Sequence, residues 1–189
     1  MEDQETVLDE AVDGFRRRAG GIAWRWEEPT PCEEWSVLDL VEHVITGNAL
    51  AVHLLEGGSA GTAPPPPQTP EAATALQRFE HSARLQREAF SRASTLGKVC
   101  DHPAGRVTGR ELLRYRAADI AVHTWDLARA LGLDEALDPL VVETAISHYL
   151  PWIASMPSSS HFRAPDGLPP AGASAQHRLL HAVGRPPVR

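Results

Sequence analysis

The sequence has 189 residues, of which 42% are hydrophobic and 23% charged, and its formal net charge is −7. This length fits one domain with or without a tail, and the apolar fraction excludes an intrinsically disordered chain. The acidic balance argues against nucleic-acid partners, which need a basic surface. No run of 18 apolar residues occurs and the N-terminus is acidic, so we expect a cytoplasmic protein with no membrane partner.

Two residue types have unusual counts. There are only two cysteines, Cys32 and Cys100, too few for a disulfide framework or for a zinc site built from thiolates. There are nine histidines, which is many for this length. The question is whether two or three of them converge on one site.

The first two predicted helices are defined by apolar periodicity and by their end signals. The first covers about residues 6–23, with apolar residues spaced three and four apart. The second begins after Ser36, which can form a capping box with Asp39, with Trp35 and Leu40 as a hydrophobic staple. It continues to the glycine pair at 57–58.

The next two predicted helices are separated by a loop. Four prolines at 64–67 predict a stiff connector, after which the third helix covers about residues 69–95. Residues 96–107 are predicted to be a loop with at most a short extended piece. The fourth helix begins after Thr108, which forms a capping box with Glu111, and ends at Gly132.

The remaining elements complete an all-α prediction. A fifth helix begins after Asp138 and continues to about Ile153, and a short last helix covers about residues 174–183. We find no convincing strand pattern. The predicted fold class is an all-α bundle, with the bundle in residues 1–157 and a tail in 158–189 whose short helix packs on it.

The fourth helix carries polar residues on a face that should be buried. Arg116, Asp119 and His123 lie on or beside the stripe formed by Leu112 and Leu127. Asp119 and His123 are four residues apart and therefore lie one above the other on the helix surface. A carboxylate and an imidazole placed in this way can bind one cation, but a tight site needs a third ligand.

His43 is the best candidate for that third ligand. It lies in the middle of the second helix among apolar residues, and Gly47, one turn further on, would allow a close approach by another group. Three ligands would leave a fourth position open, which is the pattern of a catalytic metal site. The donor types fit zinc, and would also accept nickel or another divalent ion.

The alternative is a structural pair without metal, because an Asp and a His four residues apart are often simply hydrogen-bonded. The other seven histidines are interpreted as surface or partly packed residues. Cys32 has no base at a recognisable spacing, and Trp35 and Trp125 are first interpreted as core residues.

Two segments resemble known signatures. Residues 30–43, TPCEEWSVLDLVEH, resemble the first signature of the DinB/YfiT-like superfamily, and in particular of its actinobacterial branch similar to mycothiol-dependent maleylpyruvate isomerase. Residues 118–130, ADIAVHTWDLARA, resemble the second signature. The C-terminal tail, with Gly184 and Arg185, is similar to the end of the same branch.

This resemblance implies a DinB-like four-helix bundle with a short extra C-terminal helix. It implies a divalent metal bound by His43, Asp119 and His123, and mycothiol or a similar low-molecular-weight thiol as cofactor. The bound metal keeps the sulfur as thiolate, which attacks a small electrophile. Isomerisation then proceeds by addition, bond rotation and elimination, whereas S-transfer stops after the addition.

Three functional interpretations remain open. The first is a metal-dependent thiol transferase or isomerase, with Asn48, Arg116, Trp125 and Asp126 as candidate contacts to thiol or substrate. Among these, Arg116 is the first choice for binding a carboxylate. The second is a non-catalytic metal-binding protein with a sensor, stress or accessory role, and the third is a metal-free helical bundle. A homodimer is compatible with all three.

Overall fold

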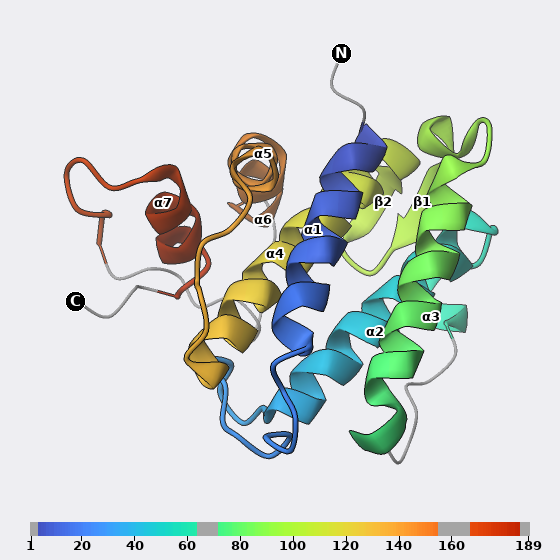
Figure 1. Ribbon diagram of the computed structural model, residues 1–189. Coiled ribbons are helices and arrows are strands. Elements are labelled where there is room, and N and C mark those ends of the chain that lie inside the picture. The colour runs from blue at the N-terminus through green and yellow to red at the C-terminus, as the bar shows by residue number, and fades with distance from the viewer. Residues whose placement is uncertain (1–3, 64–71, 155–166, 186–189) are drawn as a thin grey trace.

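The computed structural model describes residues 4–63, 72–154 and 167–185. Its main body is formed by four long helices that pack side by side (Figure 1). They are α1 (Gln4–Ala19), α2 (Val37–Leu55), α3 (Ala72–Ser91) and α4 (Gly109–Leu131). The prediction of an all-α bundle is therefore confirmed.

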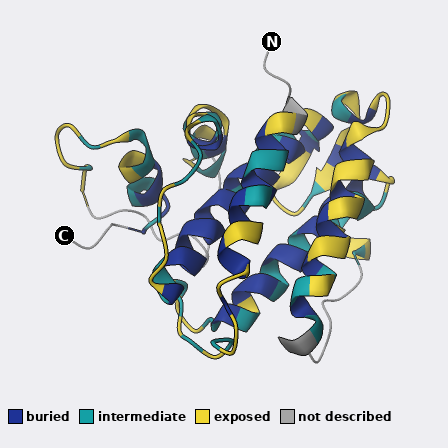
Figure 2. Cartoon of the chain, viewed as in Figure 1, coloured by how far each residue is buried: buried dark blue, intermediate teal, exposed yellow. Residues whose placement is uncertain are grey.

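Helix α4 is the central element of the bundle. It packs mainly against α1 and also against α2, while α2 packs against α3. Figure 2 shows α4 buried along most of its length, in contrast to the partly exposed α3. In the core, the rings of Phe15 and Phe79 lie 4.9 Å apart and join α1 to α3. This central position explains why polar residues on α4 are enclosed by the fold.

The capping signals give the correct starts of α2 and α4. Asp39 N–H donates to Ser36 Oγ over 3.2 Å, and Glu111 N–H donates to Thr108 Oγ1 over 3.2 Å, as the capping boxes predict. Gly132 ends α4 in a left-handed conformation with φ of 63°. By contrast, α1 and α3 end about four residues earlier than predicted, at Ala19 and Ser91, because tight turns follow them.

The segment predicted as a loop forms a β-hairpin, so the absence of strands was a wrong prediction. Strand β1 (Val99–His102) pairs with β2 (Gly105–Thr108) in antiparallel register, with Cys100 opposite Val107. Both of these side chains are buried. Each strand has only four residues, too few for an alternating pattern to stand out in the sequence.

The C-terminal part adds a shorter layer beside α4 (Figure 1). The predicted fifth helix is divided into α5 (Pro139–Thr144), a π-helical turn (Ala145–Tyr149) and α6 (Leu150–Ala154). Helix α7 (Ala175–Ala182) packs against α5. The predicted loop residues 155–166 lie outside the described part of the chain, and the division at residue 157 stays a prediction. Two short 3-10 turns, Ala60–Thr62 and Thr95–Gly97, complete the described elements.

Helix α2 is long and apolar enough to cross a membrane by length and composition, with a mean hydropathy of 1.2. No such helix was expected, because the sequence has no uninterrupted run of 18 apolar residues. In the fold its apolar residues, including Leu40, Val44 and Leu54, are buried in the bundle. The core helix of a bundle meets the same criteria, so this feature is weak evidence for a membrane span.

Candidate metal centre

The three predicted metal ligands converge between α2 and α4. His43 Nε2 lies 3.7 Å from Asp119 Oδ2, and His123 Nε2 lies 3.6 Å from Asp119 Oδ1. One donor atom from each of the three residues falls within 4.8 Å of the other two. His43 and Asp119 are partly exposed, whereas His123 is buried. Two imidazoles and a carboxylate with an open side are a donor set that fits a divalent metal ion.

Arg116 holds one side of the carboxylate of Asp119. Its Nη1 donates to Asp119 Oδ2 over 2.7 Å, and its Nη2 donates to Asn48 Oδ1 over 2.9 Å. Its Nε donates to Gln86 Oε1 over 3.2 Å. Gly47 makes room for this arrangement, since a Cβ there would lie 2.3 Å from Arg116 Nη1. The close approach predicted at Gly47 is therefore made by Arg116.

Asn48 and Arg116 are thus parts of a buried polar network. Asn48 is fully buried and also donates to Ser82 Oγ over 3.0 Å. Arg116 is 8% exposed, and its guanidinium is already bonded to three side chains. These contacts position Asp119 and join α2, α3 and α4. The predicted contact of Asn48 and Arg116 with a ligand stays a prediction.

Asp126 orients His123 from the opposite side of the imidazole. His123 Nδ1 lies 3.0 Å from Asp126 Oδ2, and because an ionised carboxylate only accepts, Nδ1 is the donor. This assigns a proton to Nδ1, so Nε2, which faces Asp119, is the ring atom that can bind a metal. Asp126 is fully buried and bonds to His123, and its predicted contact with thiol or substrate stays a prediction.

Cys32 and Arg185 complete the surroundings of Asp126. Arg185 Nε donates to Asp126 Oδ1 over 3.3 Å, and its Nη2 donates to Cys32 Sγ over 3.1 Å. Cys32 Sγ in turn donates to Asp126 Oδ2 over 3.2 Å. Cys32, His123 and Asp126 also form a group of potential metal ligands. Arg185 bonds to both Cys32 and Asp126, so the group that contains His43 is the more open of the two.

Trp35 packs against both of the histidines predicted to bind the metal. Its ring centroid lies 4.8 Å from that of His43 and 5.8 Å from that of His123. These contacts restrict the rotation of the imidazoles, a role beyond the predicted hydrophobic staple. Trp125 lies elsewhere on α4, where Arg129 stacks on its ring at 4.8 Å from the centroid. Its predicted role in binding a ligand stays a prediction.

The charges within the site shift the pKa values of its members. Burial lowers the pKa of His43 and outweighs the hydrogen bond to Asp119. Burial opposes charge on Asp119 and His123 as well, but their mutual attraction outweighs it: the pKa of Asp119 falls and the pKa of His123 rises. Without metal, this attraction therefore favours the protonated form of His123 beside ionised Asp119.

The sequence does not predict that Cys32, Arg185 and Trp35 lie beside the proposed metal ligands. Cys32 is 91 positions from His123 along the chain, and Arg185 is 59 from Asp126. No spacing rule connects residues so far apart. The available signal was indirect, since Cys32 and Trp35 lie inside the first resembling signature and Arg185 lies at the end of the tail.

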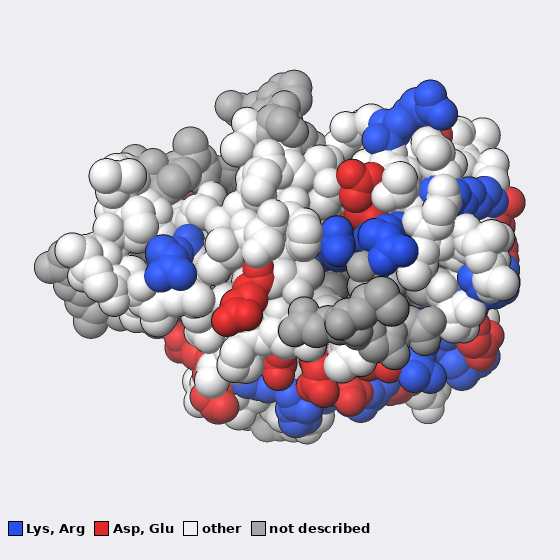
Figure 3. All heavy atoms as spheres, turned by 90° about the horizontal axis from the view of Figure 1, so that it is seen from above, with Lys and Arg blue, Asp and Glu red and all other residues white. Residues whose placement is uncertain are grey.

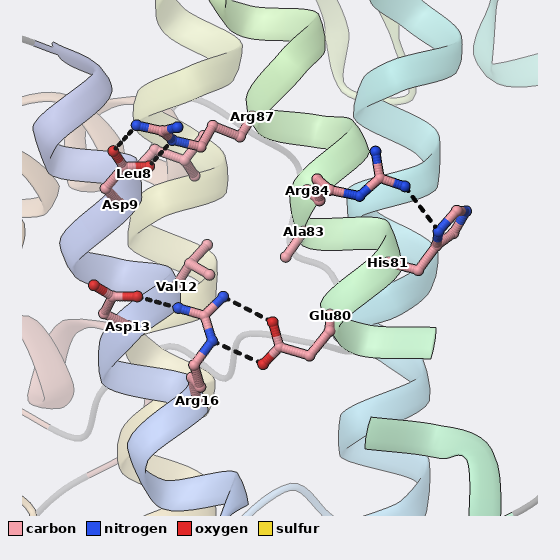
Figure 4. A pocket seen from close by; sticks show the side chains of 10 residues that line it. All are labelled: Leu8, Asp9, Val12, Asp13, Arg16, Glu80, His81, Ala83, Arg84 and Arg87. Atoms are coloured by element: carbon pink, nitrogen blue, oxygen red, sulfur yellow. Dashed lines mark hydrogen bonds and ion pairs between the residues drawn. The ribbon is translucent and has the colours of Figure 1, made fainter. Parts of the chain in front are cut away.

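A separate hollow of about 590 Å³ lies between α1 and α3 (Figure 4). Arg16 Nε donates to Glu80 Oε1 over 2.7 Å, and Arg87 Nε donates to Asp9 Oδ1 over 2.7 Å. The acids and bases that line it are thus largely paired with one another. The hollow does not include any of the predicted site residues, and we assign no ligand to it.

Comparisons with known proteins identify relatives of this chain. Two uncharacterized proteins, from two strains of Mycobacterium tuberculosis, are each 35% identical over 116 residues, which are 61% of this chain and 60% of theirs. The matched part therefore spans less than two thirds of these relatives. The crystal structure of a mutant of the mycothiol-dependent maleylpyruvate isomerase has a TM-score of 0.60 at 17% identity, over 75% of this chain and 65% of that chain. This likeness supports a shared fold.

A family model, described as the mycothiol maleylpyruvate isomerase N-terminal domain, matches residues 8–128. This range includes His43, Asp119 and His123 and ends before Arg185. The resemblance noted in the two signatures is confirmed. The chain therefore belongs to the family of mycothiol maleylpyruvate isomerase N-terminal domains.

Proposed function

We propose that this chain is a metal-dependent enzyme that activates a low-molecular-weight thiol of the mycothiol type. The thiol would be transferred to a small electrophile or would assist its isomerisation. The observation that carries the proposal is the convergence of His43, Asp119 and His123 on one point between α2 and α4. Membership of a mycothiol-dependent family supports the choice of thiol.

The protein residues have distinct roles in this proposal. His43, Asp119 and His123 would hold the divalent metal, with zinc as the first choice and nickel as another candidate. When bound, the metal replaces the proton of the thiol and keeps the sulfur as thiolate at neutral pH. Asp126 keeps the Nε2 of His123 available as a ligand atom, and Arg116 fixes the direction of Asp119.

The surface is consistent with a small-molecule reaction. Figure 3 shows basic and acidic side chains interspersed on the described part of the face seen from above, rather than one broad basic region. This pattern, with a net charge of −7, favours small ligands over nucleic acid. The fully buried Asp126 and the partly exposed His43 give the site one protected and one accessible side.

We also propose that the protein acts in the cytoplasm.

The test is metal-dependent thiol conjugation. Protein purified without a histidine tag is stripped with a chelator, reloaded with Zn²⁺ and assayed for coupling of mycothiol to monochlorobimane. We expect about one equivalent of bound zinc and a conjugation rate that is lost with His43→Ala. The matched control is His53→Ala on the same helix, where His53 contacts Thr62 rather than the metal ligands.

The outcomes separate the competing functions. Zinc uptake with no thiol-dependent rate for any electrophile tested would favour a non-catalytic metal-binding protein. Less than about a tenth of an equivalent of zinc, with no uptake on titration, would favour a metal-free structural pair. Conjugation that survives unchanged in His43→Ala would refute the proposed enzyme.

A further inference from the structure

A second group of potential metal ligands lies on the Nδ1 side of His123, whereas Asp119 lies on its Nε2 side. Cys32 Sγ lies 3.2 Å from Asp126 Oδ2 and 3.9 Å from His123 Nδ1, and Nδ1 lies 3.0 Å from Oδ2. Metal–ligand bonds of about 2.0–2.3 Å place the donor atoms of a tetrahedral site about 3.3–3.6 Å apart. The three atoms of Cys32, His123 and Asp126 are therefore close to the arrangement of one face of such a site.

Cys32 is held at the edge of this group by the turn that precedes α2. Its backbone N–H donates to Thr30 Oγ1 over 3.2 Å, and its carbonyl oxygen accepts from the N–H of Trp35 over 3.1 Å. His123 and Asp126 are buried, whereas Cys32 is partly exposed. Cys32 is thus the member of the group that lies nearest to solvent.

Arg185 supplies a positive charge to this group in the metal-free protein. Its Nη2 donates to Cys32 Sγ over 3.1 Å and to Asp126 Oδ2 over 3.4 Å, and its Nε donates to Asp126 Oδ1 over 3.3 Å. The guanidinium therefore contacts two of the three donor atoms that a metal ion would need. An ion can bind to all three only when Arg185 moves away.

The donor types distinguish this group from the position formed by His43, Asp119 and His123, which we call the first position. The first position offers two imidazoles and a carboxylate. The second group replaces one imidazole by the sulfur of Cys32, and thiolate is the softest of these ligands. A thiophilic ion such as Cd²⁺ therefore gains more than a harder ion from displacing the guanidinium.

We propose that Cys32, Asp126 and His123 Nδ1 form a second metal position, closed by Arg185, which takes a thiophilic ion and excludes the metal of the first position. The ion takes the place of the protons on Cys32 Sγ and His123 Nδ1, and these protons leave to solvent. The neutral ring then keeps its proton on Nε2, which faces Asp119 and can no longer bind a metal. The inference goes beyond the proposed function, because it involves neither the small thiol nor the electrophile.

The test is a Cd²⁺ titration of metal-free protein without a histidine tag, followed by the ultraviolet charge-transfer band of a cadmium–thiolate bond. We expect this band in the wild type at saturating Cd²⁺, with about one equivalent bound. Cys32→Ser should lose the band, and Cys100→Ala, at the other cysteine of the chain, should keep it. His43→Ala should keep it as well, because His43 is not part of the second group.

Arg185→Ala tests whether the guanidinium closes the second position. Cd²⁺ binding should become about tenfold tighter, because no charged hydrogen bonds have to be broken. Zinc binding to the first position should become weaker, because Asp126 loses a partner while it orients His123. A general loss of structure would weaken both metals. Arg178→Ala, on the exposed surface of α7, is the matched control and should change neither.

Zinc-loaded protein tests the mutual exclusion. Added Cd²⁺ should release about one equivalent of zinc as the thiolate band appears, measured by elemental analysis after gel filtration. A molecule that holds one zinc and one thiolate-bound cadmium together would contradict the exclusion.

Three further results would overturn the second position itself. They are the absence of a thiolate band in the folded wild type, a band that persists in Cys32→Ser, and equal Cd²⁺ affinity in the wild type and in folded Arg185→Ala. Circular dichroism melts check the folding, and Arg185→Gln takes the place of the alanine variant if that variant unfolds. Failure of thiol conjugation would refute the proposed function and leave these results unchanged.

Discussion

Gly47 of α2 and Arg116 of α4 meet so closely that no side chain fits between them. A Cβ on Gly47 would lie 2.3 Å from Arg116 Nη1 and 2.7 Å from its Cζ. This contact lets the guanidinium reach both Asn48 and Asp119 from inside the bundle. Gly47 is thereby linked to the direction of Asp119, a predicted metal ligand.

Gly47→Ala is expected to weaken metal binding. The alanine would improve helix propensity by about 1 kcal/mol, but it would push Arg116 away from bonded partners, so we expect a net destabilisation of about 1–2 kcal/mol. Asp119 would lose its anchor, and zinc affinity would fall. Urea unfolding and a chelator competition titration measure the two effects. Gly61→Ala, where no atom lies within 4 Å of the added Cβ, is the control and should change neither.

Asp126→Asn should lower zinc affinity by about 10–100-fold although Asp126 does not touch the metal site directly. An amide can donate to Nδ1 of His123 and so favour the wrong tautomer. Arg185→Lys should act in the same direction but more weakly, because the bond from its Nη2 to Cys32 is lost. Arg178→Lys, on the exposed surface of α7, is the control. Unaltered affinity in Asp126→Asn, with a native melting temperature, would contradict the orienting role.

The stability of the metal-free protein should have an acid limb and an alkaline limb. Burial opposes charge on Asp126, but the hydrogen bond from His123 and the charges of His123 and Arg185 lower its pKa, and attraction to His123 and Arg116 lowers that of Asp119. The stabilisation that the two carboxylates give the folded state is complete above their unfolded pKa of about 3.9. It is lost as pH falls through their lower folded pKa values. The pKa of His123 is raised, so its contribution is complete below about 6.5 and is lost as pH rises through the folded value.

Asp119, His123 and Asp126 should therefore stabilise the metal-free fold most between about pH 4 and 6.5. Urea unfolding from pH 3 to 9 measures the curve, and Asp126→Asn should flatten its acid limb. Added zinc should change the alkaline limb, since it replaces the proton on His123. Isothermal titration in buffers of different ionisation enthalpy should show about one proton released at pH 7. A proton release of zero would mean that His123 is already neutral.

Cys32→Ala should retain most of the thiol conjugation activity. In the proposed function the reacting sulfur belongs to the small thiol, and Cys32 contacts Asp126, Arg185 and His123. We expect less than a tenfold loss of rate, because Asp126 keeps its bonds to His123 and Arg185 without Cys32. The bimane assay with and without mycothiol checks this. Complete loss of activity in a folded, zinc-loaded variant would make Cys32 a reacting group.

Local signals determined much of the fold in advance. Ser36 and Thr108 gave the starts of α2 and α4, and Gly132 gave the end of α4, because caps act through hydrogen bonds within a few residues. The hairpin over residues 99–108 could not be predicted, because its strands are short. They are stabilised by pairing with each other and by burial of Cys100 and Val107.

The sequence by itself determined the helices and the helical spacing of Asp119 and His123. It also predicted His43 as third ligand, from its place among apolar residues and again through the resemblance. Only the tertiary structure decided which neighbours these ligands have. Arg116 joins Asp119 to Asn48, Arg185 reaches Asp126 from the far end of the chain, and Trp152 meets His102 across two elements. Such contacts depend on how helices pack in space, and side chains many positions apart carry no periodic signal of their meeting.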